Sequence, residues 1–138
     1  MIAVDTNVVV RLLVRDDAKQ AEAAAVLFAR GPVGLSATVL LETAWVLRSG
    51  YRLAPAAVVD ALRRVCALAN VVLEDEERCR NALDWAEGGL DFADALHLAG
   101  AQQAECFYTF DQTFARKSRG IGVALVRLPP PGERTNGE

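Results

Sequence analysis

The chain opens at residues 1–7 with the sequence MIAVDTN, in which a short apolar run stops at an acid. Such a run suits a buried strand. Just after it, Val8, Val9, Leu12 and Leu13 recur at helical spacing. The N-terminus is therefore predicted to be a strand that leads directly into a helix, with Asp5 at the junction.

The same alternation of strand and helix continues along the chain. Further strands are predicted at 33–35, 71–73, 106–109 and 123–126, and further helices at about 18–29, 37–48, 55–68, 75–87 and 92–104. Four of these helices have a recognisable start, at Asp16-Asp17, Ser36, Pro55 and Asp91. The pattern predicts an α/β fold, with a short, mainly parallel sheet of about four or five strands and helices on both faces.

Length and composition are typical of one globular domain. The 138 residues are 52% hydrophobic and 24% charged, which excludes a disordered chain. Residues 1–128 are expected to form a single domain, and the Pro-, Gly- and charge-rich segment 129–138 an irregular tail. No apolar run is long enough for a membrane span, and no basic region typical of a signal peptide begins the chain. A cytoplasmic protein with no membrane partner is therefore expected.

Four acids are expected to gather at one edge of the sheet. Asp5 and Asp111 follow predicted strands, and the carboxyl ends of parallel strands are where sites form. Glu42 and Asp94 lie on helices that can lean over the same edge. Four carboxylates without a convergent His or Cys form a hard-oxygen site, which suits Mg²⁺ or Mn²⁺ and not zinc.

Glu42 is the only acid between Gly31 and Leu53. Burying a lone carboxylate is costly unless a positive group compensates its charge. Glu42 is therefore expected to be buried beside a metal ion or a basic side chain. The net charge of −3 argues mildly against a general nucleic-acid binder, but a metal among the acids would offset their charge locally.

These acids lie in four segments that resemble the motifs of the PIN-domain family. Asp-Thr-Asn at 5–7 resembles the opening motif, and residues 35–42 resemble the second. Residues 91–99 and 109–114 resemble the third and fourth. The order, spacing and chain length further resemble the VapC-like toxins of bacterial type II toxin–antitoxin pairs, over about residues 1–127.

The resemblance implies a three-layer PIN-like sandwich and a Mg²⁺-dependent endoribonuclease that a cognate VapB-like antitoxin holds inactive. Its metal-binding and catalytic residues would be Asp5, Glu42, Asp94 and Asp111. Metal-activated water would attack the phosphorus of an RNA phosphodiester and leave 3′-hydroxyl and 5′-phosphate ends. Asn7 and Thr109 would orient these carboxylates by hydrogen bonds.

Other polar residues have plainer interpretations. Asp91 is assigned mainly to capping the helix that follows it, although it can also reach a metal through water. His97, the only histidine, is interpreted mainly as structural, and a role as a proton shuttle stays open as the alternative. Five basic residues are candidates for contacts to RNA phosphates, or else form a solvated basic surface: Arg11, Arg15, Arg116, Lys117 and Arg119.

Two other functions stay open. A catalytically silent PIN-like module would bind a protein or RNA partner without cutting it, but the presence of all four acids argues against this. A phosphoryl-transfer domain also has Asp at a strand end, yet the phosphatase pattern needs a second Asp where this chain has Asn7. A homodimer is expected as well, through the apolar helices within residues 37–68.

Overall fold

The structure, a computed structural model, describes residues 1–132. Its strands are β1 (Ile2–Ala3), β2 (Val33–Leu35), β3 (Val71–Leu73), β4 (Cys106–Tyr108) and β5 (Leu125–Arg127). Its helices are α1 (Thr6–Val14), α2 (Ala18–Arg30), α3 (Ala37–Ser49), α4 (Pro55–Cys66), α5 (Glu76–Glu87), α6 (Phe92–Ala99) and α7 (Gln112–Lys117). The tail predicted at 129–138 has no helix or strand up to residue 132, and the rest of it lies outside the described residues.

The strands pair in parallel, as an α/β fold requires, and the predicted fold class is confirmed. β1, β2 and β3 form one sheet in that order, and β4 pairs with β5 in a second sheet. A single sheet was expected from the sequence. An apolar run of two or three residues shows that a strand exists but carries too few hydrogen bonds to specify its neighbour, so the division into two sheets was not predictable from these runs.

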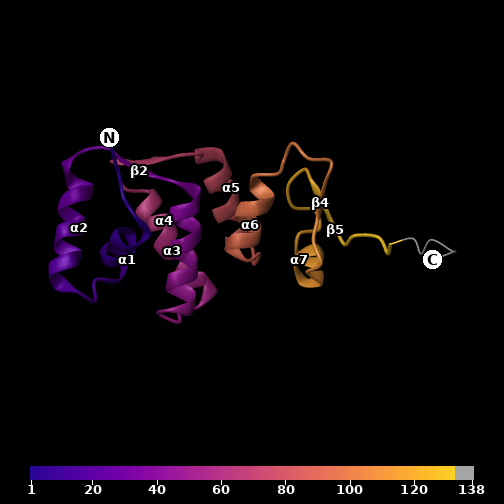
Figure 1. Cartoon of the computed structure of the whole chain (residues 1–138), viewed down its shortest axis with the longest axis horizontal. Coiled ribbons are helices and arrows are strands. Elements are labelled where there is room, and N and C mark those ends of the chain that lie inside the picture. Colours follow the sequence, from indigo (N-terminus) through magenta and orange to yellow (C-terminus); the bar gives the residue numbers. More distant parts are fainter. Residues whose placement is uncertain (133–138) are drawn as a thin grey trace, which may run out of the picture.

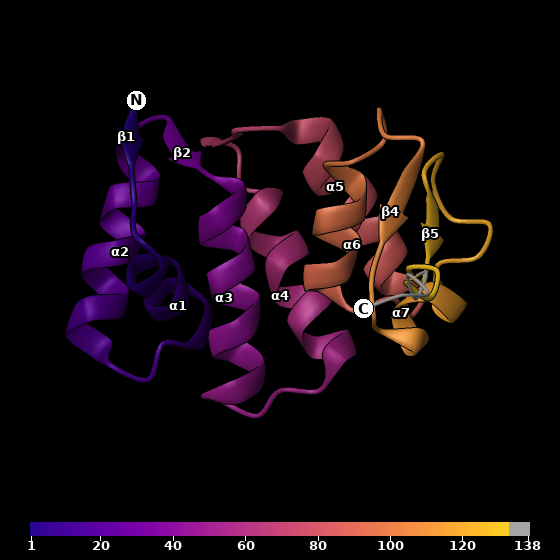
Figure 2. The ribbon, with the colours of Figure 1, turned by 45° about the vertical axis from the view of Figure 1, so that its right-hand side comes forward.

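The elements are laid out along the molecule in nearly their sequence order. In Figure 1 and Figure 2, β1 and β2 lie at one end with α1 and α2, whereas β4, β5 and α7 lie at the other. Helices α3 and α6 lie between these two ends in both views. No helix within residues 1–132 is long and apolar enough to cross a membrane.

Helix starts follow the predicted caps, whereas the last strand begins at Leu125 and not at 123, one helix ends early and one helix was not predicted. The side chains of Asp17 and Ser36 accept hydrogen bonds from the backbone N–H groups of Gln20 (3.0 Å) and Val39 (3.1 Å). The helix predicted at 92–104 ends at Ala99 because Gly100, a weak helix former, takes the cap position. Helix α7 was not predicted, since six residues are too few to show a helical period.

One hydrophobic core holds α3, α4, α5 and α6 together. Its fully buried side chains include Leu40 and Leu47 of α3, Leu62 of α4, and Leu96 and Leu98 of α6. Helix α3 packs on α6, and α4 packs on α5. Because β4 follows α6 after only a short connection, this helix packing also decides where β4 lies.

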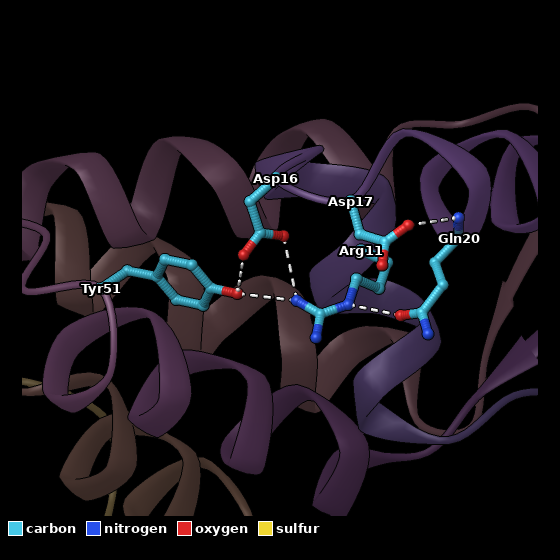
Figure 3. Close-up of polar contacts among 5 residues, drawn as sticks. All are labelled: Arg11, Asp16, Asp17, Gln20 and Tyr51. Atoms are coloured by element: carbon cyan, nitrogen blue, oxygen red, sulfur yellow. Dashed lines mark hydrogen bonds and ion pairs between the residues drawn. The ribbon is translucent and has the colours of Figure 1, made fainter.

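A polar network ties α1 to the helices around it (Figure 3). Nη1 of Arg11 donates to Asp16 and to the Tyr51 hydroxyl, each at 2.9 Å, and that hydroxyl donates to the other Asp16 oxygen at 2.8 Å. Nε of Arg11 donates to Gln20 at 2.7 Å. The Tyr51 hydroxyl, and after it the Arg11 charge, hold the pKa of Asp16 below its usual range.

We expect Leu47→Ala to lower the free energy of unfolding by about 2–5 kcal/mol, because it leaves a cavity in the shared core. Leu68→Ala removes the same atoms from a half-exposed side chain and should cost at most about 1 kcal/mol. Urea denaturation of both variants measures the difference. Equal losses in the two variants would show that Leu47 is not part of a tightly packed core.

Candidate functional site

Asp5 and Glu42, here called the N-terminal acid pair, are linked through Thr6, whose backbone contacts Asp5 and whose side chain contacts Glu42. Asp5 directly precedes α1, and its Oδ1 accepts the backbone N–H of Thr6 at 2.8 Å. The Thr6 hydroxyl donates to Oε2 of Glu42 on α3 at 3.2 Å. Thr6 is only 7% exposed, so its hydroxyl is held between the two helices and restrains the Glu42 carboxylate.

Thr6 is a positioning residue that the sequence analysis missed. It stands inside the Asp-Thr-Asn motif, but its contact with Glu42 depends on how α1 packs on α3, which the motif does not specify. Asn7 was expected to orient a carboxylate instead. Its side chain forms no hydrogen bond within residues 1–132, and it lines a hollow beside α1 and α2.

Glu42 is exposed, so the expectation that it is buried was wrong. Helix α3 turns Leu40, Ala44 and Leu47 into the core and leaves Glu42 and Trp45 on its open side. An isolated acid in an apolar stretch therefore marks an exposed position on a helix whose other faces are largely buried. Its exposure leaves the carboxylate accessible to a ligand.

Asp94 and Asp111, here called the C-terminal acid pair, lie at the starts of α6 and α7. Oδ1 of Asp111 accepts the N–H of Phe114 at 3.0 Å and so caps α7. The Thr109 hydroxyl accepts the backbone N–H of Asp111 at 3.0 Å, so it fixes the backbone at Asp111 and not its carboxylate. Burial raises the pKa of Asp94, and the charges of Asp91 and Asp111 raise it further.

The predicted capping role of Asp91 is confirmed. Its Oδ2 accepts the backbone N–H of Asp94 at 3.2 Å, at the start of α6. Its Oδ1 accepts a hydrogen bond from Arg48 of α3 at 2.9 Å, and the two groups form an ion pair. Asp91 thereby fastens the first turn of α6, which carries Asp94, to α3.

Within one chain the four acids form two separate pairs and not one cluster. Within residues 1–132, no group of three or more His, Cys, Asp or Glu side chains is placed to hold a metal ion. The donor chemistry nevertheless fits Mg²⁺, which often uses one or two carboxylates and completes its coordination with waters and phosphate oxygens. A divalent cation would also offset the negative charges of Asp91 and Asp111, which, after burial, raise the pKa of Asp94.

A hollow of about 610 Å³ is bordered by α3, α4 and α6. Its wall is largely apolar and includes Trp45, whereas its polar lining includes Glu42, Asp91, His97 and Lys117. The hollow thus has Glu42 on one side and the start of α6 on the other. No sequence pattern indicates this hollow, because residues of several helices that are far apart in the sequence assemble it.

The basic residues differ in how accessible they are to an RNA phosphate. Arg11 is engaged in the network of Figure 3, so a phosphate would have to compete with Asp16 for it. The four other candidate RNA contacts are exposed: Arg15, Arg116, Lys117 and Arg119. A role for any of them in binding RNA stays a prediction.

We expect Thr6→Val to weaken the binding of Mn²⁺ by about 10–100-fold, because the isosteric change leaves the Glu42 carboxylate unrestrained. Thr6→Ser keeps the hydroxyl and should restore most of the affinity. Calorimetric titration with Mn²⁺ measures the affinity, and urea denaturation checks that each variant is folded. Unchanged affinity in a folded Thr6→Val protein would refute the positioning role.

We also expect Asp94→Asn to become more stabilising relative to the wild type as the pH rises from about 3 to 7. A raised folded-state pKa means that the Asp94 contribution is fully present below its ordinary value of 3.8 and is lost as the pH rises through the folded value. Urea denaturation in EDTA measures this difference. A difference that stays constant with pH, or one that falls, would contradict the raised pKa.

Comparison with known proteins agrees with the motif assignment. Residues 2–120 match the PIN domain. No curated protein matches the chain significantly. Because the match spans most of the sequence, the chain belongs to the PIN domain family and is a nuclease-type module.

Proposed function

We propose that this protein is a Mg²⁺-dependent endoribonuclease and the toxin of a VapBC-type toxin–antitoxin pair. The observation that carries the proposal is that each of the four motif acids has another as its neighbour. Thr6 connects Asp5 to Glu42, and the charge of Asp111 acts on Asp94. Family membership supplies the nuclease class to which this arrangement belongs.

The protein's own residues account for holding and orienting the reactants. A Mg²⁺ or Mn²⁺ ion bound by these carboxylates would lower the pKa of a water and neutralise charge on phosphate oxygens. Thr6 restrains Glu42, and the Arg48–Asp91 ion pair restrains the helix turn that carries Asp94. Hydrolysis joins the water oxygen to phosphorus and breaks the P–O3′ bond, which leaves 3′-hydroxyl and 5′-phosphate ends.

Basic residues near the C-terminal acid pair would attract the RNA backbone. Arg116, Lys117 and Arg119 follow Asp111 on or just after α7, and all three are exposed. Contacts of this kind bind phosphates without reading sequence, so they support RNA binding but do not choose the target.

A VapB-like antitoxin would act by covering the exposed acids and the apolar hollow beside them. Trp45 lines that hollow and is 69% exposed, so an apolar segment of a partner has a surface to cover. An antitoxin Arg placed among the carboxylates would form bidentate contacts and compete with the metal. We place the action of both proteins in the cytoplasm, where such a toxin meets its RNA.

One observation favours the alternative of a catalytically silent module that binds a protein or RNA. The two acid pairs do not meet within a single chain. A silent module would bind its partner without a divalent metal, and loss of the acids would leave that binding unchanged.

The nuclease assignment predicts cleavage of a cellular RNA pool at discrete sites with Mg²⁺ or Mn²⁺ and none with EDTA. Asp5→Asn and Asp94→Asn should each reduce the rate by about 1,000-fold, since losing metal stabilisation costs several kcal/mol. Asp60→Asn changes an exposed acid of α4 outside the motifs and serves as the matched control. Equal cleavage by wild type and Asp94→Asn would indicate a contaminating nuclease, and metal-independent RNA binding without cleavage would favour the silent module.

A further inference from the structure

The sheet formed by β4 and β5 has one covered face and one open face. Phe107 and Val126 are partners on the covered face, where the ring of Phe107 packs edge-on against Phe114 of α7 with 5.5 Å between the ring centres. Side chains alternate between the two faces of a strand, so Tyr108 and its partner Arg127 lie on the open face. Tyr108 is 57% exposed, and Arg127 is exposed as well. The open face therefore presents an aromatic ring and a guanidinium group side by side.

An open face is unusual for strands that run parallel, because parallel sheets are generally covered on both faces. Leu125 lies two residues before Arg127 on β5, hence also on the open face, and it is exposed. Phe110 lies two residues after the end of β4, directly before Asp111, and is 87% exposed. Residues 1–132 leave these large apolar side chains uncovered, and such groups gathered on one surface mark a binding site.

The charge of this part of the chain indicates an anionic partner. Residues 106–127, from the start of β4 to the end of β5, contain four basic residues and one acid, whereas the whole chain has a net charge of −3. The acid is Asp111 of the candidate site. Within residues 1–132 none of the four basic side chains forms an ion pair, and all are exposed: Arg116, Lys117, Arg119 and Arg127. Such a group of free cations attracts the phosphates of a nucleic acid.

The exposed rings select a single strand over a duplex. Unpaired bases stack on aromatic side chains and on Arg guanidinium planes, whereas the bases of a duplex are already stacked on one another. Tyr108 and Phe110 are two residues apart, about 7 Å along an extended chain, so each ring has room for its own base. A duplex would contact the basic groups and leave both rings without a partner.

We propose that the open face of the β4–β5 sheet is a binding platform for single-stranded RNA, with bases stacked on Tyr108 and Phe110 and a phosphate held by Arg127. This inference rests on the proposed function for the reaction and adds the class of substrate, which is an unpaired stretch of RNA. Phe110 directly precedes Asp111, so a base stacked on Phe110 brings its phosphate close to the C-terminal acid pair. The platform thus leads an unpaired strand along β4 towards the candidate site.

The stacking role is tested by two substitutions at Tyr108. Tyr108→Leu keeps an apolar side chain but removes the ring, and it should weaken the binding of single-stranded RNA about tenfold. Tyr108→Phe keeps the ring and should bind like the wild type. Fluorescence anisotropy in EDTA measures the dissociation constants of a labelled single strand of about ten nucleotides and of a duplex of the same length. Binding of the duplex should be the same in all three proteins, and urea denaturation checks that each is folded.

The contact between Arg127 and a phosphate is tested by the salt dependence of binding. Arg127→Gln should lower the slope of log K against log salt concentration by about 0.7, the value for one phosphate of a single strand. Arg30→Gln is the matched control, because Arg30 is an exposed base at the end of α2, on the opposite side of the molecule in Figure 1 and Figure 2. The control should leave the slope unchanged.

The inference is overturned if folded Tyr108→Leu binds the single strand as tightly as the wild type, or if the wild type does not bind it. Unchanged RNA binding by Tyr108→Leu with an altered mass in sedimentation equilibrium would place another protein chain on this face, which also overturns the inference. Equal loss of single-strand and duplex binding would contradict stacking in the same way.

Binding in EDTA is measured apart from cleavage, so the two proposals fail separately. A wild type that binds the single strand through Tyr108 but cleaves no RNA in Mg²⁺ or Mn²⁺ retains the platform and refutes the nuclease. A wild type that cleaves RNA while Tyr108→Leu binds and cleaves equally well retains the nuclease and refutes the platform.

Discussion

The packing of α5 and α6 against α3 and α4 is the constraint on which the rest of the structure depends. The buried side chains of Leu47, Leu62, Leu96 and Leu98 join these helices in one core. That core sets the start of α6, where Asp94 lies, relative to the open side of α3, where Glu42 lies. It also carries β4 to the end of the molecule opposite β1, which is why the four motif acids appear as two pairs.

Much of the fold could be predicted from the sequence because its signals are local. Apolar runs gave the five strands, helical spacing gave six of the helices, and Asp17 and Ser36 cap the helices that follow them. The neighbours of β4 could not be predicted, since its three residues carry no information about which strand they pair with. The end of α6 and the existence of α7 each depend on a single helical turn. A periodic pattern of apolar residues extends over several turns and therefore cannot locate them.

In the candidate site, too, local features could be predicted from the sequence and features that depend on helix packing could not. The motifs located Asp5, Glu42, Asp94 and Asp111, and the cap at Asp91 follows from its place before α6. The contact between Thr6 and Glu42 and the exposure of Glu42 both depend on which face of α3 is buried, and an isolated motif does not show that face. The same limit applies to Arg11, whose partners Asp16 and Tyr51 come together only in three dimensions (Figure 3).

A nuclease that works through a carboxylate-bound metal leaves a chemical signature that other ribonucleases do not. The most direct measurement is therefore to map the ends of the RNA products that the purified wild-type protein makes in Mg²⁺ or Mn²⁺. The account predicts 5′-phosphate and 3′-hydroxyl ends at discrete positions, and no products in EDTA. Products that end in a 2′,3′-cyclic phosphate, or cleavage that persists in EDTA, would contradict it.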